Sequence, residues 1–211
     1  MKTKRCIAIV LLVSLLISVY SYINLRYEIR INDAVNIWYA VIFQGKSLTP
    51  LMMYLLPLFA IMVSIVQFIP EMTDKRLKLT LHLPAKEIDI MLSMLLYGYT
   101  TLLILYATTY FLIFFLMLSL FSLDIVIGSM AQISVWMIAG FISYGLTAWI
   151  VLEPKWKYRI FNICIALTMI SVLYINTLPL GYSDFKSGLM ITTVVSFFFP
   201  VYSCIRFKEG I

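Results

Sequence analysis

Charged residues are scarce in this chain. Of its 211 residues only 12% are Asp, Glu, Lys or Arg, 63% are hydrophobic, and the mean hydropathy is +0.99. A soluble domain carries about 25% charged residues, so this chain lacks the polar side chains that a water-facing surface needs. The composition excludes a soluble enzyme and predicts one integral membrane domain of the all-α class, spanning residues 1–211.

Histidine and cysteine are also few. With His82 as the only histidine, neither a His-based metal cluster nor a Ser–His–Asp set can be built. We therefore expect no catalytic residue, no metal and no cofactor on this chain. The segment 40–47 (AVIFQGKS) resembles a phosphate-binding loop, but Ala40 replaces its first glycine and no strand precedes it. We interpret this match as chance, so ATP and magnesium have no predicted site here.

What the chain does have is long apolar runs. Six of them are long enough to cross a hydrocarbon core of about 30 Å as helices. The third run is the longest, and only Asp124 separates it from the fourth, which predicts a tight helical hairpin. The predicted spans are approximately Ile7–Ile23, Leu48–Ile69, Ile90–Leu123, Ile125–Leu152, Ile160–Leu178 and Gly188–Ile205.

The distribution of basic residues predicts how the spans are oriented across the membrane. With the N-terminus inside, twelve of the sixteen Lys and Arg residues fall on the cytoplasmic side and four fall outside. We expect both termini in the cytoplasm and a multi-pass protein of the cell membrane. The first external connection, Asn24–Ser47, begins polar and becomes amphipathic around Ile37–Phe43, which predicts a short helix at the outer interface. Pro57 predicts a kink in the second span.

Charges are nearly absent inside the spans, unlike in proton-driven transporters and ion pumps. The polar groups at mid-span are neutral, and Tyr99, Tyr106 and Tyr110 share one side of the third span. Together with Gln132, this stripe either lines a path for an amphipathic substrate or packs against neighbouring helices, and packing is the favoured interpretation.

One stretch differs from the rest. Residues 71–89 read EMTDKRLKLTLHLPAKEID and form the only long, dense run of charge, placed between the second and third spans. The run must be water-facing, on the cytoplasmic side. Its leucines repeat every second residue and also pair at i, i+4, so they can present apolar anchors to a partner protein inside a polar rim. Alternatively they anchor a solvated loop at the bilayer surface.

This stretch resembles the connection between the second and third spans in membrane subunits of type 2 ATP-binding-cassette exporters. In that family an acidic residue is followed by Gly-Thr, then by a Leu-rich run that ends in Leu-Pro and a basic or polar residue. This chain departs from the pattern at Lys75-Arg76, where Gly-Thr is common. The matching positions are Glu71, then Leu77, Leu79 and Leu81, then Leu83-Pro84, and Lys86.

The resemblance implies a permease subunit whose cytoplasmic coupling helix, between the second and third spans, docks into a separate ATPase subunit. That subunit would hold ATP and magnesium, and the permease would pair with itself or with a similar permease as a homodimer or heterodimer. Membrane lipids are also expected partners, whereas nucleic acid is not. The residues expected to bind the ATPase are Glu71, Arg76, Leu77, Leu81, His82, Leu83, Pro84 and Lys86.

The alternative is a six-span membrane enzyme or scaffold that acts on lipids without an ATPase. An enzyme needs acidic, His or Cys groups that converge near the membrane surface. The only candidates are Glu71, Asp74, His82 and Asp89, and they lack a recognisable metal-ligand spacing.

Overall fold

The computed structural model describes residues 2–32, 34–44, 46–73, 86–175 and 185–209. Every regular element in these ranges is an α-helix. Six of the helices are long and apolar enough to cross a membrane, in the order that the sequence predicts. The helices are α1 (Lys2–Asn32), α2 (Ala34–Phe43), α3 (Pro50–Thr73), α5 (Glu87–Leu118), α6 (Leu123–Leu152), α7 (Trp156–Leu173) and α8 (Lys186–Glu209).

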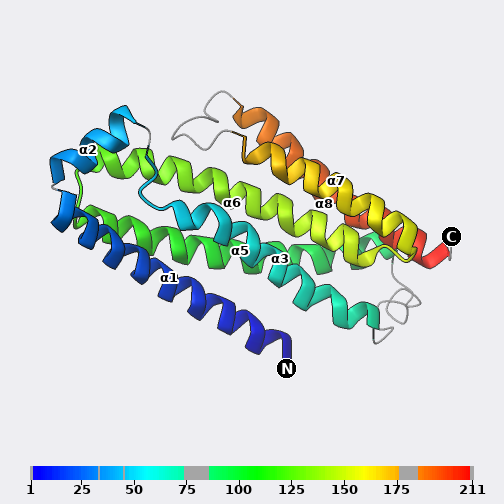
Figure 1. Ribbon diagram of the computed structural model, residues 1–211. Helices are drawn as coiled ribbons and strands as arrows, with labels where there is room; N and C mark the ends of the chain where they lie inside the picture. The colour runs from blue at the N-terminus through cyan, green and yellow to red at the C-terminus, as the bar shows by residue number, and fades with distance from the viewer. Residues whose placement is uncertain (1, 33, 45, 74–85, 176–184, 210–211) are drawn as a thin grey trace.

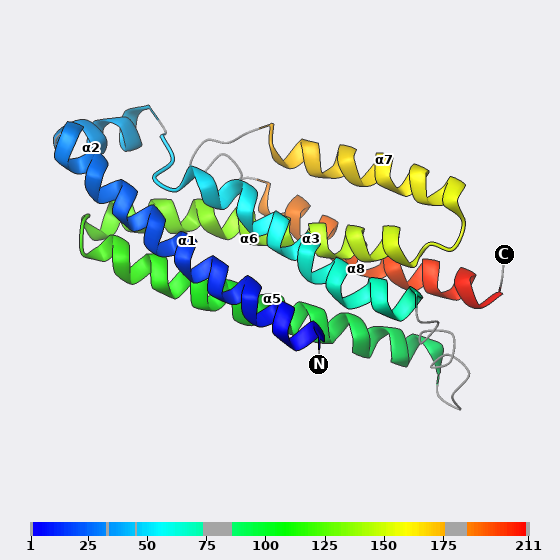
Figure 2. The same ribbon diagram turned by 60° about the horizontal axis from the view of Figure 1, so that its bottom comes forward.

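Helix α6 forms the centre of the bundle. It packs most extensively against α3 and α8, and also against α5 and α7. The reason lies in its sequence, where small and hydroxylated residues recur between apolar ones, so that neighbouring backbones can approach closely. Helices α1 and α7 lie on opposite flanks, α1 beside α5 and α7 against α6 (Figures 1 and 2).

The long helices alternate in direction, so their connections gather at two ends of the bundle (Figure 1). At one end, which we call the loop end, α3 finishes at Thr73, α5 begins at Glu87, α6 turns into α7 at residues 153–155, and α8 finishes. At the opposite end lie α2 and the turn between α5 and α6. The positive-inside prediction assigns the loop end to the cytoplasm, and this orientation stays a prediction.

The first span is longer than predicted. We expected it to end at Ile23 and the chain to continue as a polar connection, yet α1 stays helical through Asn32. A helix can carry charged residues beyond the membrane surface because its backbone hydrogen bonds are internal. Glu28 on this extension forms an ion pair with Lys46, at 3.5 Å. The predicted helix around Ile37–Phe43 is part of α2.

Other boundaries shifted by a few residues. The hairpin between the third and fourth spans is as tight as predicted, but α5 ends at Leu118, before the predicted Leu123, and Asp124 is in the first turn of α6. Helix α7 ends at Leu173, short of the predicted Leu178. Helix α3 is one continuous element with Pro57 and Pro70 inside it.

Candidate functional site

Most of the predicted coupling residues fall outside the described residues. These are Arg76, Leu77, Leu81, His82, Leu83 and Pro84, so the predicted coupling helix itself stays a prediction. The structure describes the two residues that bracket them. Glu71 is half-buried in the last turn of α3, and Lys86 is exposed and occupies the N-cap position of α5 without a side-chain capping hydrogen bond. Both ends of the charged stretch are helical, because α3 runs to Thr73 and α5 begins at Glu87.

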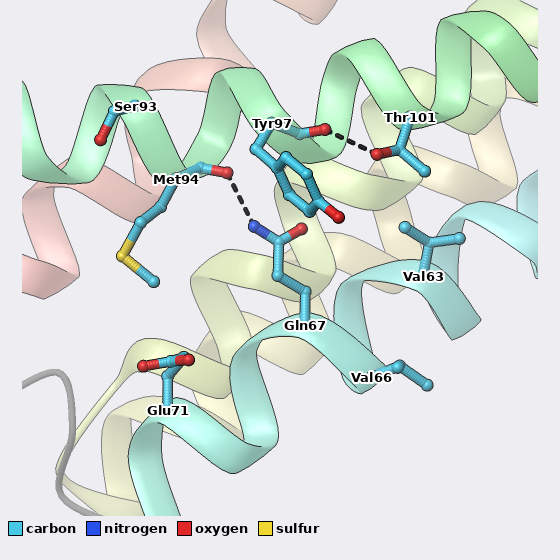
Figure 3. A pocket seen from close by; sticks show the side chains of 8 residues that line it. All are labelled: Val63, Val66, Gln67, Glu71, Ser93, Met94, Tyr97 and Thr101. Carbon is cyan, nitrogen blue, oxygen red and sulfur yellow. Dashed lines mark hydrogen bonds between the residues drawn. The ribbon is translucent and has the colours of Figure 1, made fainter. Parts of the chain in front are cut away.

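Near the end of α3, one glutamine side chain, Gln67, forms hydrogen bonds with two neighbouring helices. The Gln67 side-chain amide on α3 donates a 2.7 Å hydrogen bond to the Met94 carbonyl oxygen on α5, as Figure 3 shows. Its own oxygen accepts a 2.9 Å hydrogen bond from the Tyr144 hydroxyl on α6. Gly98 on α5 leaves the space for this hydroxyl, because a Cβ there would collide with it. We call this arrangement the Gln67 bridge.

A cavity of about 360 Å³ lies beside the Gln67 bridge, between α3 and α5. We call it the polar cavity, because its walls carry hydroxyl, amide and carboxylate groups at the loop end. Figure 3 shows Tyr97 reaching from α5 toward α3, with Gln67 and Glu71 one turn apart on α3. The lining residues are Val63, Val66, Gln67, Glu71, Ser93, Met94, Tyr97 and Thr101.

A second cavity of about 310 Å³ adjoins the first, further from the loop end. We call it the apolar cavity, since its walls are aliphatic apart from Tyr97 and Thr101. It shares Val63 and these two residues with the polar cavity, and its remaining lining comes from α1 and α5, namely Val10, Leu11, Ile104 and Leu105. The two cavities together form one groove along α5.

The tyrosine stripe of α5 makes helix–helix contacts. Tyr106 is buried and donates a 2.8 Å hydrogen bond to the Leu56 carbonyl oxygen on α3. Tyr99 packs its ring against Tyr144 at 4.8 Å between centroids and against Phe197 at 5.3 Å. These contacts within the chain agree with the interpretation that the stripe packs against neighbouring helices. The role of Tyr99, Tyr106, Tyr110 and the buried Gln132 in lining a pathway stays a prediction.

The sequence analysis missed a buried acidic residue at the loop end. Glu153, directly after α6, is fully buried. Its Oε2 accepts a 2.7 Å hydrogen bond from the Ser203 hydroxyl on α8, and its Oε1 lies 3.4 Å from Nη1 of Arg206. That geometry is an ion contact rather than a well-formed hydrogen bond, since Oε1 has no hydrogen-bond partner among the described residues.

Arginine side chains complete this cluster. Arg159 on α7 donates from Nη2 to the carbonyl oxygens of Glu153, at 2.8 Å, and Val151, at 3.3 Å, which are among the last carbonyls of α6. The guanidinium carbon of Arg206 lies 4.2 Å from the centre of the Tyr158 ring, a cation–π distance. Side chains of α7 and α8 therefore hold the end of α6, and we call this set the Glu153 cluster.

A sequence signal for the Glu153 cluster existed. Residues 153–159 (EPKWKYR) are strongly basic, and the one acidic residue among them directly follows an apolar run. We interpreted this segment only as a basic loop, because sequence spacing alone does not show that Arg206, 53 positions later, returns to the same end.

Comparisons of this chain with protein-family models, with curated proteins and with solved structures found no match.

Proposed function

We propose that this chain is the permease subunit of an ATP-binding-cassette exporter, working in the cell membrane with a separate ATPase subunit. The six apolar helices supply the membrane domain that this role requires. The resemblance of residues 71–86 to the coupling connection of that family is the reason to propose an ATPase partner. Within the complex the chain pairs with a second copy or with a similar permease to form the export pathway.

The observation that carries the proposal is the Gln67 bridge. A coupling element works only if a push on it moves the helices that form the pathway, and Glu71 is one turn beyond Gln67 on α3. Through its 2.7 and 2.9 Å hydrogen bonds, Gln67 joins the end of α3 to α5 and to the central helix α6. A displacement at the loop end would thereby be transmitted to three helices together.

The mechanism follows from this connection. Closure of the ATPase would push on residues 71–89, and α3 and α5 would transmit the motion to the opposite end. There the chain between α1 and α3 includes the short helix α2, which also contacts α6. This end would open and close the external side of the pathway.

The proposal is tested by isolating the tagged chain from its native host in mild detergent and identifying what accompanies it by mass spectrometry. Recovery of a soluble ATPase with Walker motifs is the expected result. Isolation without any ATPase, under conditions that keep other such complexes together, contradicts the proposal and favours the alternative of a membrane enzyme or scaffold.

A further inference from the structure

The groove beside the Gln67 bridge matches one leaflet of a bilayer in length. From Ser93 to Leu105 its wall on α5 extends about 18 Å, at ~1.5 Å per residue. Half of a hydrocarbon core is about 15 Å thick. With the loop end at the membrane surface, the polar cavity lies at the depth of lipid head groups and the apolar cavity reaches toward the midplane.

The groove is open to lipid at its side. Helix α1 starts beside α5 well short of the end where α5 begins, as Figure 2 shows. Val10 and Leu11 of α1 line the apolar cavity, whereas the described residues that line the polar cavity all belong to α3 and α5. Tyr97 and Ile104 in the walls are about half exposed, at 51% and 57%. A membrane lipid can therefore enter from the bilayer.

The polar cavity presents acceptors to a head group. Among the described residues that line the two cavities Glu71 is the only charged one, and its carboxylate only accepts hydrogen bonds when ionised. The Ser93 hydroxyl donates to its own helix, at 2.7 Å to the Ile90 carbonyl, which leaves its oxygen lone pairs for a ligand. The Gln67 amide donates one of its two N–H groups to the Met94 carbonyl oxygen and accepts from the Tyr144 hydroxyl. The Glu71 carboxylate therefore favours a cationic donor over an anionic head group at this end.

Deeper in the groove the chemistry changes. The Tyr97 hydroxyl has no hydrogen-bond partner among the described residues, so it can donate to an ester carbonyl of a lipid. Beyond Tyr97 the walls are aliphatic side chains of α1, α3 and α5, which suit an acyl chain. The total volume, with about 360 Å³ in the polar cavity alone, falls in the range of about 300–1,000 Å³ typical of ligand sites.

We propose that this groove is a binding site for a bilayer lipid with a primary ammonium head group. The ammonium lies against Glu71 and Ser93, the ester region lies against Tyr97, and one acyl chain lies along Val63 and Leu105. The proposal does not rest on the ATPase partnership, because it concerns a contact between this chain and its own membrane.

The test is lipid retention by the purified full chain. The chain in detergent micelles is exposed to equimolar phosphatidylethanolamine and phosphatidylglycerol with identical acyl chains, and the bound lipid is counted by native mass spectrometry. We expect phosphatidylethanolamine to be retained about tenfold over phosphatidylglycerol, the effect of a hydrogen bond to a charged group. Phosphatidylcholine, whose quaternary ammonium has no N–H donor, should be retained less than phosphatidylethanolamine.

Two variants locate the site. Glu71→Gln should abolish the preference for phosphatidylethanolamine, whereas Asp89→Asn, which removes an exposed carboxylate outside the groove, should keep it. Thr101→Phe fills the junction of the two cavities and should lower retention of every lipid about tenfold. Leu103→Phe adds a ring to the lipid-facing side of the same helix, outside the groove, and should leave retention unchanged.

The proposal is overturned by equal retention of phosphatidylethanolamine and phosphatidylglycerol in the unmodified chain, a result that depends on no variant. A preference that survives Glu71→Gln, or equal retention of phosphatidylcholine and phosphatidylethanolamine, also overturns it. If a second copy of the chain filled the groove instead, Thr101→Phe would change the oligomeric state in size-exclusion chromatography and leave lipid retention unaltered.

Discussion

The Tyr144 hydroxyl on α6 donates a 2.9 Å hydrogen bond to the side-chain oxygen of Gln67 on α3, inside the apolar bundle and close to the loop end. This contact joins the end of α3 to the central helix. The Gln67 amide also donates to the Met94 carbonyl oxygen, so the same side chain connects α5 to these two helices.

The Gln67 bridge predicts a measurable coupling between two side chains. Gln67→Leu and Tyr144→Phe should each destabilise the protein, and the double variant should lose less than the sum of the two. The expected coupling is about 0.6 kcal/mol, and at most ~1.7 kcal/mol, because hydrogen bonds between membrane helices contribute in this range. The measurement is reversible unfolding in mixed micelles, and strictly additive losses would contradict the bridge.

Close helix packing predicts opposite effects at two glycines of α6. A Cβ at Gly145 would lie 2.5 Å from the Ser196 carbonyl oxygen on α8, which is backbone and cannot turn away. Gly145→Ala should therefore force α6 and α8 apart and cost about 1–3 kcal/mol. At Gly128 a Cβ meets nothing within 4 Å, so Gly128→Ala should stabilise by about 0.5–1 kcal/mol through helix propensity. Thermal melting in detergent compares the two, and equal shifts would contradict the packing.

The Glu153 cluster predicts an unequal response of its two charges. Arg206→Leu removes the ion pair of a fully buried carboxylate, whose one hydrogen-bond donor among the described residues is the Ser203 hydroxyl, and should cost about 3–5 kcal/mol. Glu153→Gln leaves an arginine whose side chain is 17% exposed and can extend toward the head groups, so the loss should be about 1 kcal/mol. The same unfolding measurement ranks the two variants, and the reverse order would show that Arg206, not Glu153, is the buried charge.

The coupling proposal predicts that a charge placed in the coupling stretch weakens ATPase binding and abolishes transport. Leu83→Glu places a charge among the predicted apolar anchors, so ATPase affinity should fall about tenfold or more, as expected for an anchor worth ~2 kcal/mol. Transport should be lost while membrane insertion stays intact. Ser122→Glu is the control, because Ser122 is exposed in the turn at the opposite end. Undiminished transport by Leu83→Glu would exclude Leu83 from the coupling element.

The number and order of the spans could be predicted from the sequence, because a membrane helix needs about 20 apolar residues in a row and few other segments have them. The ends of the helices could not. The first span extends to Asn32 through Arg26, Glu28 and Arg30, since the loss of hydrophobicity marks the membrane surface and not the end of backbone hydrogen bonding.

The candidate site could be predicted less well than the spans. Gln67 is one polar residue in an apolar run, and its role depends on Met94 and Tyr144, which are 27 and 77 positions away. The same holds for Glu153 with Ser203, 50 positions away. The sequence shows that a polar group in a membrane helix needs a partner. The packing of the helices determines which residue is that partner, and the sequence pattern does not predict this packing.

The most direct test of the account is photo-cross-linking from the coupling stretch in living cells. A photoreactive amino acid is placed at Leu83 in one variant and at Ser122 in another, and adducts are identified by mass spectrometry after illumination. The account predicts a covalent adduct with a Walker-type ATPase from Leu83 and none from Ser122. An ATPase adduct that is absent from Leu83, in cells where the chain is inserted in the membrane, would contradict the central claim that this stretch docks the ATPase.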